Sequence, residues 1–276
     1  MENLVSNWSR TAPTLPKSYI FPPDKRPDQL TFPLDKTIPV IDFANHDPTS
    51  TMEQIMKAGQ EYGIFQVINH GVSKELLDET MKVVKEFHAM PTEDKARECS
   101  KDPKKRCRLY TSSENFSTEE LHYWRDALVH PCHPLEEQMQ FWPENPIRYR
   151  EVVGKFTIEV RKLANKILEM ISQGLGLSPG FFGGELCENP VVLVITNGRL
   201  KGAEHRVVTN SGLPRTTTSL FIYPSNDSLI KPEATLVDAS NNPPLYRAFH
   251  YKDFRSYFIS NTADAKKVHE FMDRYN

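Results

Sequence analysis

The feature that most constrains the fold is a long amphipathic stretch from Ile147 to Leu175. Apolar residues recur in it at intervals of three and four, which is the period of an α-helix with one buried face. Gly174 and Gly176 follow the last of them and are typical of a helix end. We expect this helix to be the spine against which a sheet packs. The pattern is carried by Val152, Val153, Phe156, Val160, Leu163, Ala164, Ile167, Leu168 and Ile171.

The chain before this helix predicts short strands that alternate with helices. Ile38–Phe43 and Ile64–Ile68 are short apolar runs that indicate strands, and Thr51–Tyr62 between them has helical spacing. Ser73 is a helix N-cap residue, followed by a helical apolar face that continues to about Met90.

After the long helix the character changes. Ser178-Pro179 predicts a short helix with serine as the cap and proline in the first turn. From Pro190 onward β-branched residues dominate, and Asn197-Gly198 is a typical two-residue hairpin turn. The predicted elements are the strands Val191–Ile195, Arg199–Val208 and Thr216–Tyr223, and a C-terminal helical segment Tyr251–Tyr275.

We therefore expect an α+β fold in three parts. Residues 1–36 are rich in proline and predict an extended arm, residues 37–188 form a helical and mixed region, and residues 189–276 form a β region with a helical end.

Two side chains in the β region suggest chemistry. His205 precedes the turn around Ser211-Gly212, and Arg215 follows it, so an antiparallel pair of strands brings both into one neighbourhood. A neutral imidazole is a good ligand for iron, zinc or copper, and a guanidinium binds carboxylates through two hydrogen bonds. This combination predicts a metal site beside an anion site.

His205 and Arg215, with Thr217 two residues later, resemble the C-terminal half of the signature of plant 2-oxoglutarate- and Fe(II)-dependent dioxygenases. The resemblance covers nearly the whole chain, and the later segments look most like the branch that contains hyoscyamine 6-dioxygenase. The other segments that carry it are Thr37–Phe43, Tyr62–Val72, Met90–Lys95, Tyr123–Leu128 and Pro131–Leu135.

The resemblance implies a jelly-roll core, also called a double-stranded β-helix, and a reaction in which Fe(II), 2-oxoglutarate and oxygen hydroxylate a small plant metabolite. It implies that His205 is an iron ligand and that Arg215 and Thr217 hold the distal carboxylate of 2-oxoglutarate. Tyr123 and Trp124 correspond to a region that lines the substrate pocket in such proteins, although core packing explains these aromatic residues equally well.

One departure from the family pattern is large. The family completes its iron site with a His-x-Asp pair, but none of the nine histidines here has an acidic residue two positions later. Residues 188–194 run directly into residues 195–200, where relatives carry a long segment with an Asn-x-Tyr and the His-x-Asp. We interpret this as an internal deletion near Val194 that leaves the jelly-roll incomplete. One imidazole does not hold Fe(II) tightly, so we expect no more than trace turnover.

Three interpretations remain open. The chain is a shortened version of an enzyme, or a truncated isoform that binds a metabolite or a full-length relative without catalysis, or a non-functional remnant. Other groupings are weaker. His130 and His133 lack the second ligand pair of a zinc site and predict a surface loop, the basic run 101–108 predicts a solvated loop, and nothing places His250 and Asp253 near His205.

Composition limits the other functions. A net charge of −2 gives no argument for nucleic acid or anionic membranes, and no run approaches the length of about 20 apolar residues of a membrane helix. Four cysteines without a Cys-x-x-Cys pair predict reduced thiols and a cytoplasmic protein. We expect a small-molecule substrate and a monomer that associates or aggregates through exposed strand edges.

Overall fold

The structure is a computed structural model that describes residues 4–9, 12, 14–23, 26, 38–102, 104–183, 189–203, 205, 207, 212–261 and 265–273. Half of the predicted arm 1–36, including its tip, therefore lies outside the described residues. The chain forms two compact units. Unit 1 contains residues 1–35, 73–159 and 207–219, and unit 2 contains residues 36–72, 160–206 and 220–276.

Unit 1 is built on helix α3 (Lys74–Ala89) and an antiparallel strand pair, β3 (Arg108–Thr111) and β4 (Asp126–Val129). The predicted cap is confirmed, because the Ser73 hydroxyl accepts a hydrogen bond from the Leu76 backbone N–H at 3.2 Å. The unit also contains the 3-10 turn Glu93–Lys95 and helix α4 (Leu135–Met139). Its core consists of Leu4, Val83, Val84, Phe87, Leu109, Trp142, Tyr149, Val152 and Val153.

The described part of the N-terminal arm is attached to unit 1 through β4. Helix α1 (Val5–Trp8) donates its first backbone N–H groups, those of Val5 and Ser6, to the Asp126 carboxylate at 2.9 and 2.8 Å. A carboxylate at a helix N-terminus satisfies donors that the helix itself leaves unpaired. A 3-10 turn at Lys17–Tyr19 follows. The arm is thus anchored by a charged hydrogen bond and by the complete burial of Leu4.

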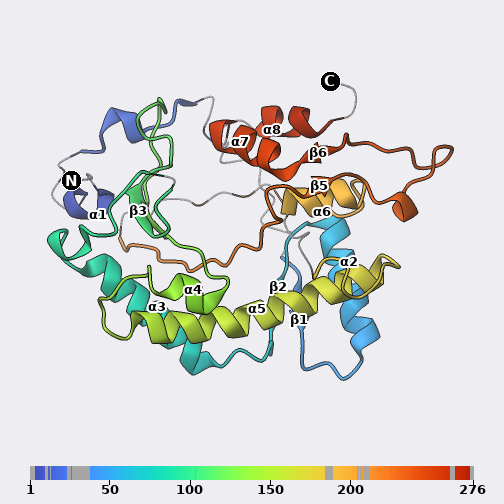
Figure 1. Cartoon of the computed structure of the whole chain (residues 1–276), viewed down its shortest axis with the longest axis horizontal. Coiled ribbons are helices and arrows are strands. Elements are labelled where there is room, and N and C mark those ends of the chain that lie inside the picture. The colour runs from blue at the N-terminus through green and yellow to red at the C-terminus, as the bar shows by residue number, and fades with distance from the viewer. Residues whose placement is uncertain are drawn as a thin grey trace. The chain divides into compact units, whose positions relative to one another are not determined.

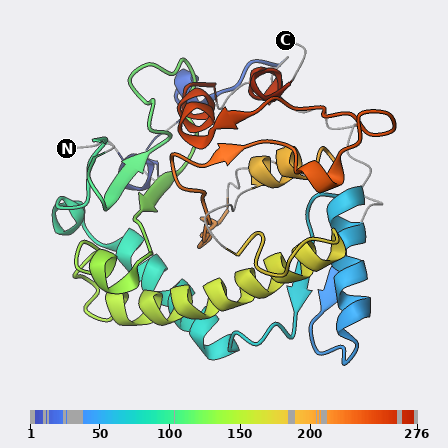
Figure 2. The same cartoon turned by 45° about the vertical axis from the view of Figure 1, so that its right-hand side comes forward.

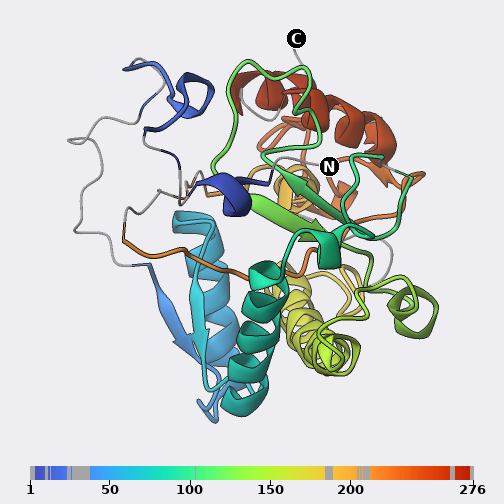
Figure 3. The same ribbon diagram turned by 90° about the vertical axis from the view of Figure 1, so that its left-hand side faces the viewer.

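Unit 2 begins with two parallel strands, β1 (Val40–Asp42) and β2 (Gln66–Ile68), connected by helix α2 (Pro48–Glu61) (Figure 3). The two predicted strands and the predicted helix are confirmed at these positions. Asp47 caps α2 by accepting from the Thr49 backbone N–H at 3.0 Å. Ile41 from β1 packs against Ile55 and Ala58 of α2.

The predicted long helix is α5 (Tyr149–Gly174) (Figure 2). Its early turns contribute Val152 and Val153 to the core of unit 1, and its later residues Leu168 and Ile171 pack against the core of unit 2. Gly176 ends it as predicted, with a φ of 75° in the left-handed region and its N–H bonded to the Gln173 carbonyl at 2.9 Å.

The predicted strand Val191–Ile195 is wrong, because this segment is helix α6 (Asn189–Ile195). Val191, Val194 and Ile195 have the i, i+3, i+4 spacing of one helical face, and each is at most 3% exposed. Burial of that face outweighs the β preference of the valines, since β propensity is a weak and context-dependent term.

The predicted hairpin turn at Asn197-Gly198 is also wrong, because these two residues end helix α6. Asn197 has a φ of 53°, its N–H bonds to the Val194 carbonyl at 3.0 Å, and the Gly198 N–H bonds to the Leu193 carbonyl at 2.9 Å. These two bonds form a Schellman motif, in which a left-handed residue directly after the helix satisfies the last carbonyls.

The end of unit 2 combines a two-stranded antiparallel pair with two helices that lie side by side (Figure 1). The helical prediction for this end is confirmed, although it divides into two helices. The elements are β5 (Leu229–Ile230), a 3-10 turn at Ala234–Leu236, β6 (Phe249–His250), α7 (Tyr251–Asn261) and α8 (Ala265–Met272). Their core includes Phe182, Val191, Val194, Ile230, Leu236, Phe249, Phe254 and Met272.

The class is α+β, as predicted. The described residues contain three two-stranded sheets and no closed pair of facing sheets, so the β core is incomplete. The predicted strands Arg199–Val208 and Thr216–Tyr223 are not strands in the described residues 199–203, 205, 207 and 216–223. The short helix predicted at Ser178-Pro179 is a turn, in which the Phe181 N–H bonds to the Ser178 carbonyl at 2.9 Å.

Candidate functional site

His205, the predicted metal ligand, is an exposed residue of unit 2. Its Nδ1 lies 3.0 Å from the backbone carbonyl oxygen of Ala203. Because a carbonyl oxygen only accepts hydrogen bonds, Nδ1 is the donor, and in the neutral form of the ring Nε2 has the lone pair. This is the arrangement by which proteins orient a ligating imidazole, so His205 itself is suited to bind a metal.

The rest of an iron site does not gather around it. Among the residues that the structure describes, no three His, Cys, Asp or Glu side chains lie close enough together to hold a metal ion. A facial Fe(II) centre needs two histidines and one carboxylate from the protein. The described residues therefore do not fit an iron centre, and we derive no chemical step through iron.

Arg215 and Thr217, the predicted carboxylate clamp, are both exposed. They belong to the 207–219 segment of unit 1, whereas His205 belongs to unit 2. The antiparallel strands expected to join them are not formed in the described residues, and the turn residue Ser211 lies outside those residues. A strand pair forms only when its two edges bond to each other, and sequence alternation alone does not ensure this.

Tyr123 and Trp124, the predicted pocket residues, lie in an aromatic cluster of unit 1. The Trp124 ring is 5.3 Å from the rings of both Trp8 and Tyr19, and Tyr123 is 5.9 Å from Phe21. These edge and tilted contacts are typical of stabilising aromatic packing, so the two residues fix the N-terminal arm to the loop before β4.

A buried polar network in the β3–β4 loop was not anticipated from the sequence. Glu119 accepts hydrogen bonds from the hydroxyls of Ser112 and Ser113 and from Nδ1 of His122, the last at 2.8 Å. The His122 ring stacks on Phe116 at a centroid distance of 4.0 Å. Ser112 adopts a φ of 63°, and this local backbone feature has no strong sequence signal. The network holds the loop in one shape and contains no activated nucleophile.

His130 and His133 do not form a zinc site. His133 is exposed, as a surface loop predicts, but His130 packs against Trp142 at 4.4 Å and its Nε2 lies 3.0 Å from the Tyr149 hydroxyl. Burial lowers the pKa of His130 to about 4, because the charged imidazolium loses its hydration. The loop prediction therefore holds at the exposed His133, whereas His130 is a partly buried loop residue that is neutral near neutral pH.

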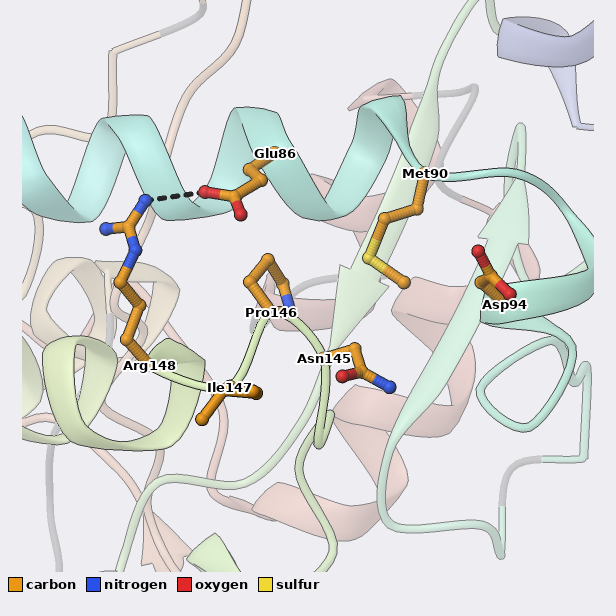
Figure 4. Close-up of a pocket in the computed structure, with 7 residues that line it drawn as sticks. All are labelled: Glu86, Met90, Asp94, Asn145, Pro146, Ile147 and Arg148. Carbon is orange, nitrogen blue, oxygen red and sulfur yellow. Dashed lines mark hydrogen bonds and ion pairs between the residues drawn. The ribbon is translucent and has the colours of Figure 1, made fainter.

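A pocket of about 720 Å³ opens on unit 1 between α3 and the start of α5 (Figure 4). An ion pair between Arg148 and Glu86 at 2.5 Å neutralises part of its charge. None of the predicted site residues lines it, and its side chains include no metal-ligand set. The lining residues are Glu86, Met90, Asp94, Asn145, Pro146, Ile147 and Arg148.

Comparison with known proteins identifies the family. Residues 38–145 match the model described as the N-terminal region of non-haem dioxygenases in morphine synthesis. Hyoscyamine 6-dioxygenase from Hyoscyamus niger is 33% identical over 337 aligned positions that cover 96% of each chain. Protein DOWNY MILDEW RESISTANCE 6 from Arabidopsis thaliana is 30% identical and covers 91% of this chain and 93% of its own.

Two solved structures have the same fold as this chain. The crystal structure of JOX2 in complex with 2OG, Fe and JA matches with a TM-score of 0.78 at 23% identity, and covers 98% of this chain and 97% of that one. The rice dioxygenase for auxin oxidation matches with a TM-score of 0.64 at 17% identity, over 82% of this chain and 96% of its own.

Proposed function

The chain belongs to the plant 2-oxoglutarate- and Fe(II)-dependent dioxygenase family, and we propose that it is a member whose own iron site is incomplete. Members of this family use Fe(II) and 2-oxoglutarate to hydroxylate small plant metabolites. The complete form of this protein then oxidises such a metabolite, whereas the chain as it stands turns over at trace levels or not at all.

The ligand set of the described residues carries this proposal. His205 supplies one oriented imidazole, but no second and third ligand join it there. A single imidazole on an exposed segment offers Fe(II) only one bond to the protein. The affinity for Fe(II) therefore stays low. In this proposal Arg215 and Thr217 are the remaining part of a carboxylate clamp, and Tyr123 and Trp124 border the substrate side.

A deletion explains the missing ligands. The alignment with the Hyoscyamus protein spans 337 positions against the 276 residues of this chain, so at least 61 aligned positions have no residue here. We place this deletion near Val194, where the sequence passes from residue 188 to residue 200 without a His-x-Asp, and we propose a truncated isoform.

A non-catalytic binder is the second candidate, and one observation favours it. Each unit has an apolar core of its own, in which Trp142 or Phe182 is completely buried. A chain that keeps its packed cores retains surfaces for binding a metabolite or a full-length relative even when it has lost catalysis.

The cysteines support a proposal for the compartment. Burial raises the pKa of the Cys107 thiol to about 12, so it stays protonated and unreactive. We propose the cytoplasm as the location, where such thiols remain reduced. No helix in the described residues is long and apolar enough to cross a membrane.

An anaerobic titration of the full chain with Fe(II) and 2-oxoglutarate tests the proposal, followed by exposure to oxygen and a succinate assay. We expect no saturable visible chelate band and no substrate-dependent succinate. His205→Ala has a matched control in His250→Ala, because His250 is also exposed and its Nδ1 also lies near a backbone carbonyl, that of Asp227, at 3.2 Å.

A chelate band that disappears in His205→Ala and Arg215→Ala but persists in His250→Ala would show that an iron site assembles around His205. That outcome would overturn the proposal. Transcript sequencing across Val194-Ile195 separately decides whether a longer form exists.

A further inference from the structure

The pocket on unit 1 is separate from the residues of the predicted iron site. All of its lining residues belong to unit 1, so the pocket is formed within one compact unit. Its volume of about 720 Å³ lies in the range of small-molecule sites. The pocket therefore has room for a ligand that does not depend on iron.

One wall of the pocket is apolar. Ile147 is 92% exposed, and Pro146 beside it and Met90 at the end of α3 are half-buried. The close-up in Figure 4 shows Pro146 and Ile147 between the charged groups of the pocket. A single exposed isoleucine is ordinary on a protein surface, but three apolar residues that border one pocket give an apolar ligand a place to leave water.

The charges of the pocket leave one carboxylate without a counter-charge. Arg148 and Glu86 neutralise each other through their ion pair at 2.5 Å, and Asp94 lies at the opposite end of the pocket in Figure 4. Among the described residues the exposed Asp94 carboxylate has no ion-pair or hydrogen-bond partner. Lys95 does not supply the missing charge, because it is 1% exposed and its Nζ donates to the His88 carbonyl oxygen at 2.8 Å. The lining residues therefore carry a net negative charge.

An amide oxygen adds a second acceptor to the lining. Asn145 is exposed and lines the same pocket as Asp94. The adjacent Glu144 is already paired with Arg97 at 2.5 Å. An ammonium group has several N–H donors, so it can bond to a carboxylate and to an amide oxygen at the same time.

We propose that this pocket binds a small organic cation, an amine with an apolar body. Asp94 and Asn145 hold its ammonium group. Its apolar body lies against Met90, Pro146 and Ile147. The net negative charge of the lining repels an anion, and a neutral ligand forgoes the ion pair. Because Asp94 is exposed, this ion pair is screened by salt, so the binding is weak and strongest at low ionic strength.

This binding goes beyond the proposed function and requires neither iron nor the missing segment. Three probes with one apolar body and different head groups test it: phenylbutylammonium, phenylbutanol and phenylbutyrate. Each is titrated at low salt into the full chain and followed through the methyl NMR signals of Ile147 and Met90. We expect saturable shifts with the ammonium, an affinity roughly fivefold to tenfold lower for the alcohol, and no saturable shifts with the carboxylate.

Two variants with matched controls assign the contacts. Asp94→Asn keeps the shape of the side chain and should lower the affinity for the ammonium to that of the alcohol, with the alcohol unchanged. Glu93→Gln is its control, because Glu93 is an exposed carboxylate on the same 3-10 turn but does not line the pocket. Ile147→Ala should weaken the ammonium and the alcohol alike, by roughly threefold. Its control is Ile158→Ala, an exposed isoleucine of α5 outside the lining.

Four results would overturn the proposal. The first is an ammonium probe without saturable binding, and the second is equal affinity for all three probes. The third is an Asp94→Asn variant that keeps its preference for the ammonium, or a Glu93→Gln variant that loses it equally. The fourth is self-association in sedimentation velocity that Ile147→Ala abolishes, because it would assign this surface to a second copy of the chain.

Discussion

Asn197 provides a quantitative test of the structure at the segment where the deletion is placed. It is 3% exposed, and its amide joins helix α6 to the loop after residue 241. The Nδ2 group donates to the Asn242 side-chain oxygen at 3.2 Å and to the Pro243 carbonyl at 3.1 Å, and Oδ1 accepts from the Leu245 N–H at 2.7 Å.

Two substitutions of Asn197 separate the energy of its side-chain hydrogen bonds from the energy of its left-handed backbone conformation. Asn197→Gly removes three hydrogen bonds, each with a net contribution of about 1 kcal/mol, so we expect a loss of about 3 kcal/mol in the free energy of unfolding. Asn197→Ala loses the same bonds and also leaves at a φ of 53° a residue that, unlike asparagine, has no side-chain hydrogen bond to offset the left-handed conformation, which costs about 1 kcal/mol more. The alanine variant should therefore lose about 4 kcal/mol in total.

Urea unfolding followed by circular dichroism measures both losses. Asn241→Ala is the control, because Asn241 is exposed and its side chain makes one hydrogen bond, to Asp238 at 2.9 Å. It should change stability by less than about 1 kcal/mol. An exposed hairpin turn at Asn197 would make the glycine variant nearly neutral. A near-neutral Asn197→Gly would therefore refute the helix end and its buried hydrogen bonds.

Three further predictions concern His130, Thr218 and Gly63. The pKa of His130 is about 4 in the folded protein against about 6.5 in the unfolded chain, so the unfolded chain binds a proton first as the pH falls. The free energy of unfolding should therefore be unaffected by His130 above pH 6.5 and fall by about 3 kcal/mol as the pH drops to 4. In urea titrations at several pH values this decline should be absent from His130→Gln, and an equal decline in both proteins would contradict it. The buried hydroxyl oxygen of Thr218 has no hydrogen-bond partner among the described residues, so Thr218→Val should raise the unfolding free energy by roughly 1 kcal/mol, and a lower value would contradict this. Gly63 has a φ of 69°, and a Cβ there would lie 2.7 Å from the Lys201 carbonyl oxygen, so Gly63→Ala should cost roughly 2 kcal/mol or more. Gly71→Ala is its control, because Gly71 also has a positive φ but has nothing within 4 Å, and equal losses in the two would exclude the steric contribution.

The helical part of the fold was predictable because its signals are local. The apolar period of residues 147–175 and the cap at Ser73 depend on spacing along one segment, and both are present as α5 and α3. Gly176 was recognisable as a stop because a left-handed residue after a helix favours glycine.

The β part was less predictable because a strand needs a partner from elsewhere in the chain. Val191–Ile195 has the composition of a strand, but its burial in unit 2 favours a helix. The sequence did contain a signal for that helix, since Pro190 suits a first turn and Asn197 suits a left-handed end. Arg215–Tyr223 has strand periodicity, yet it belongs to no sheet of the described residues.

The sequence by itself determined the family, the long helices and the identity of the residues that match the family's site. His205, Arg215 and Thr217 are recognisable as letters at fixed spacing, and the lack of a His-x-Asp is equally visible without a structure. The tertiary structure decided which segments pair and which remain open. It gave His205 a hydrogen bond that orients its imidazole, but it brought no two companion ligands to it from the described residues, and there it placed Arg215–Tyr223 in no sheet. The physical reason is that metal sites and sheets both need groups from distant parts of the chain, and local sequence preference does not bring those groups together.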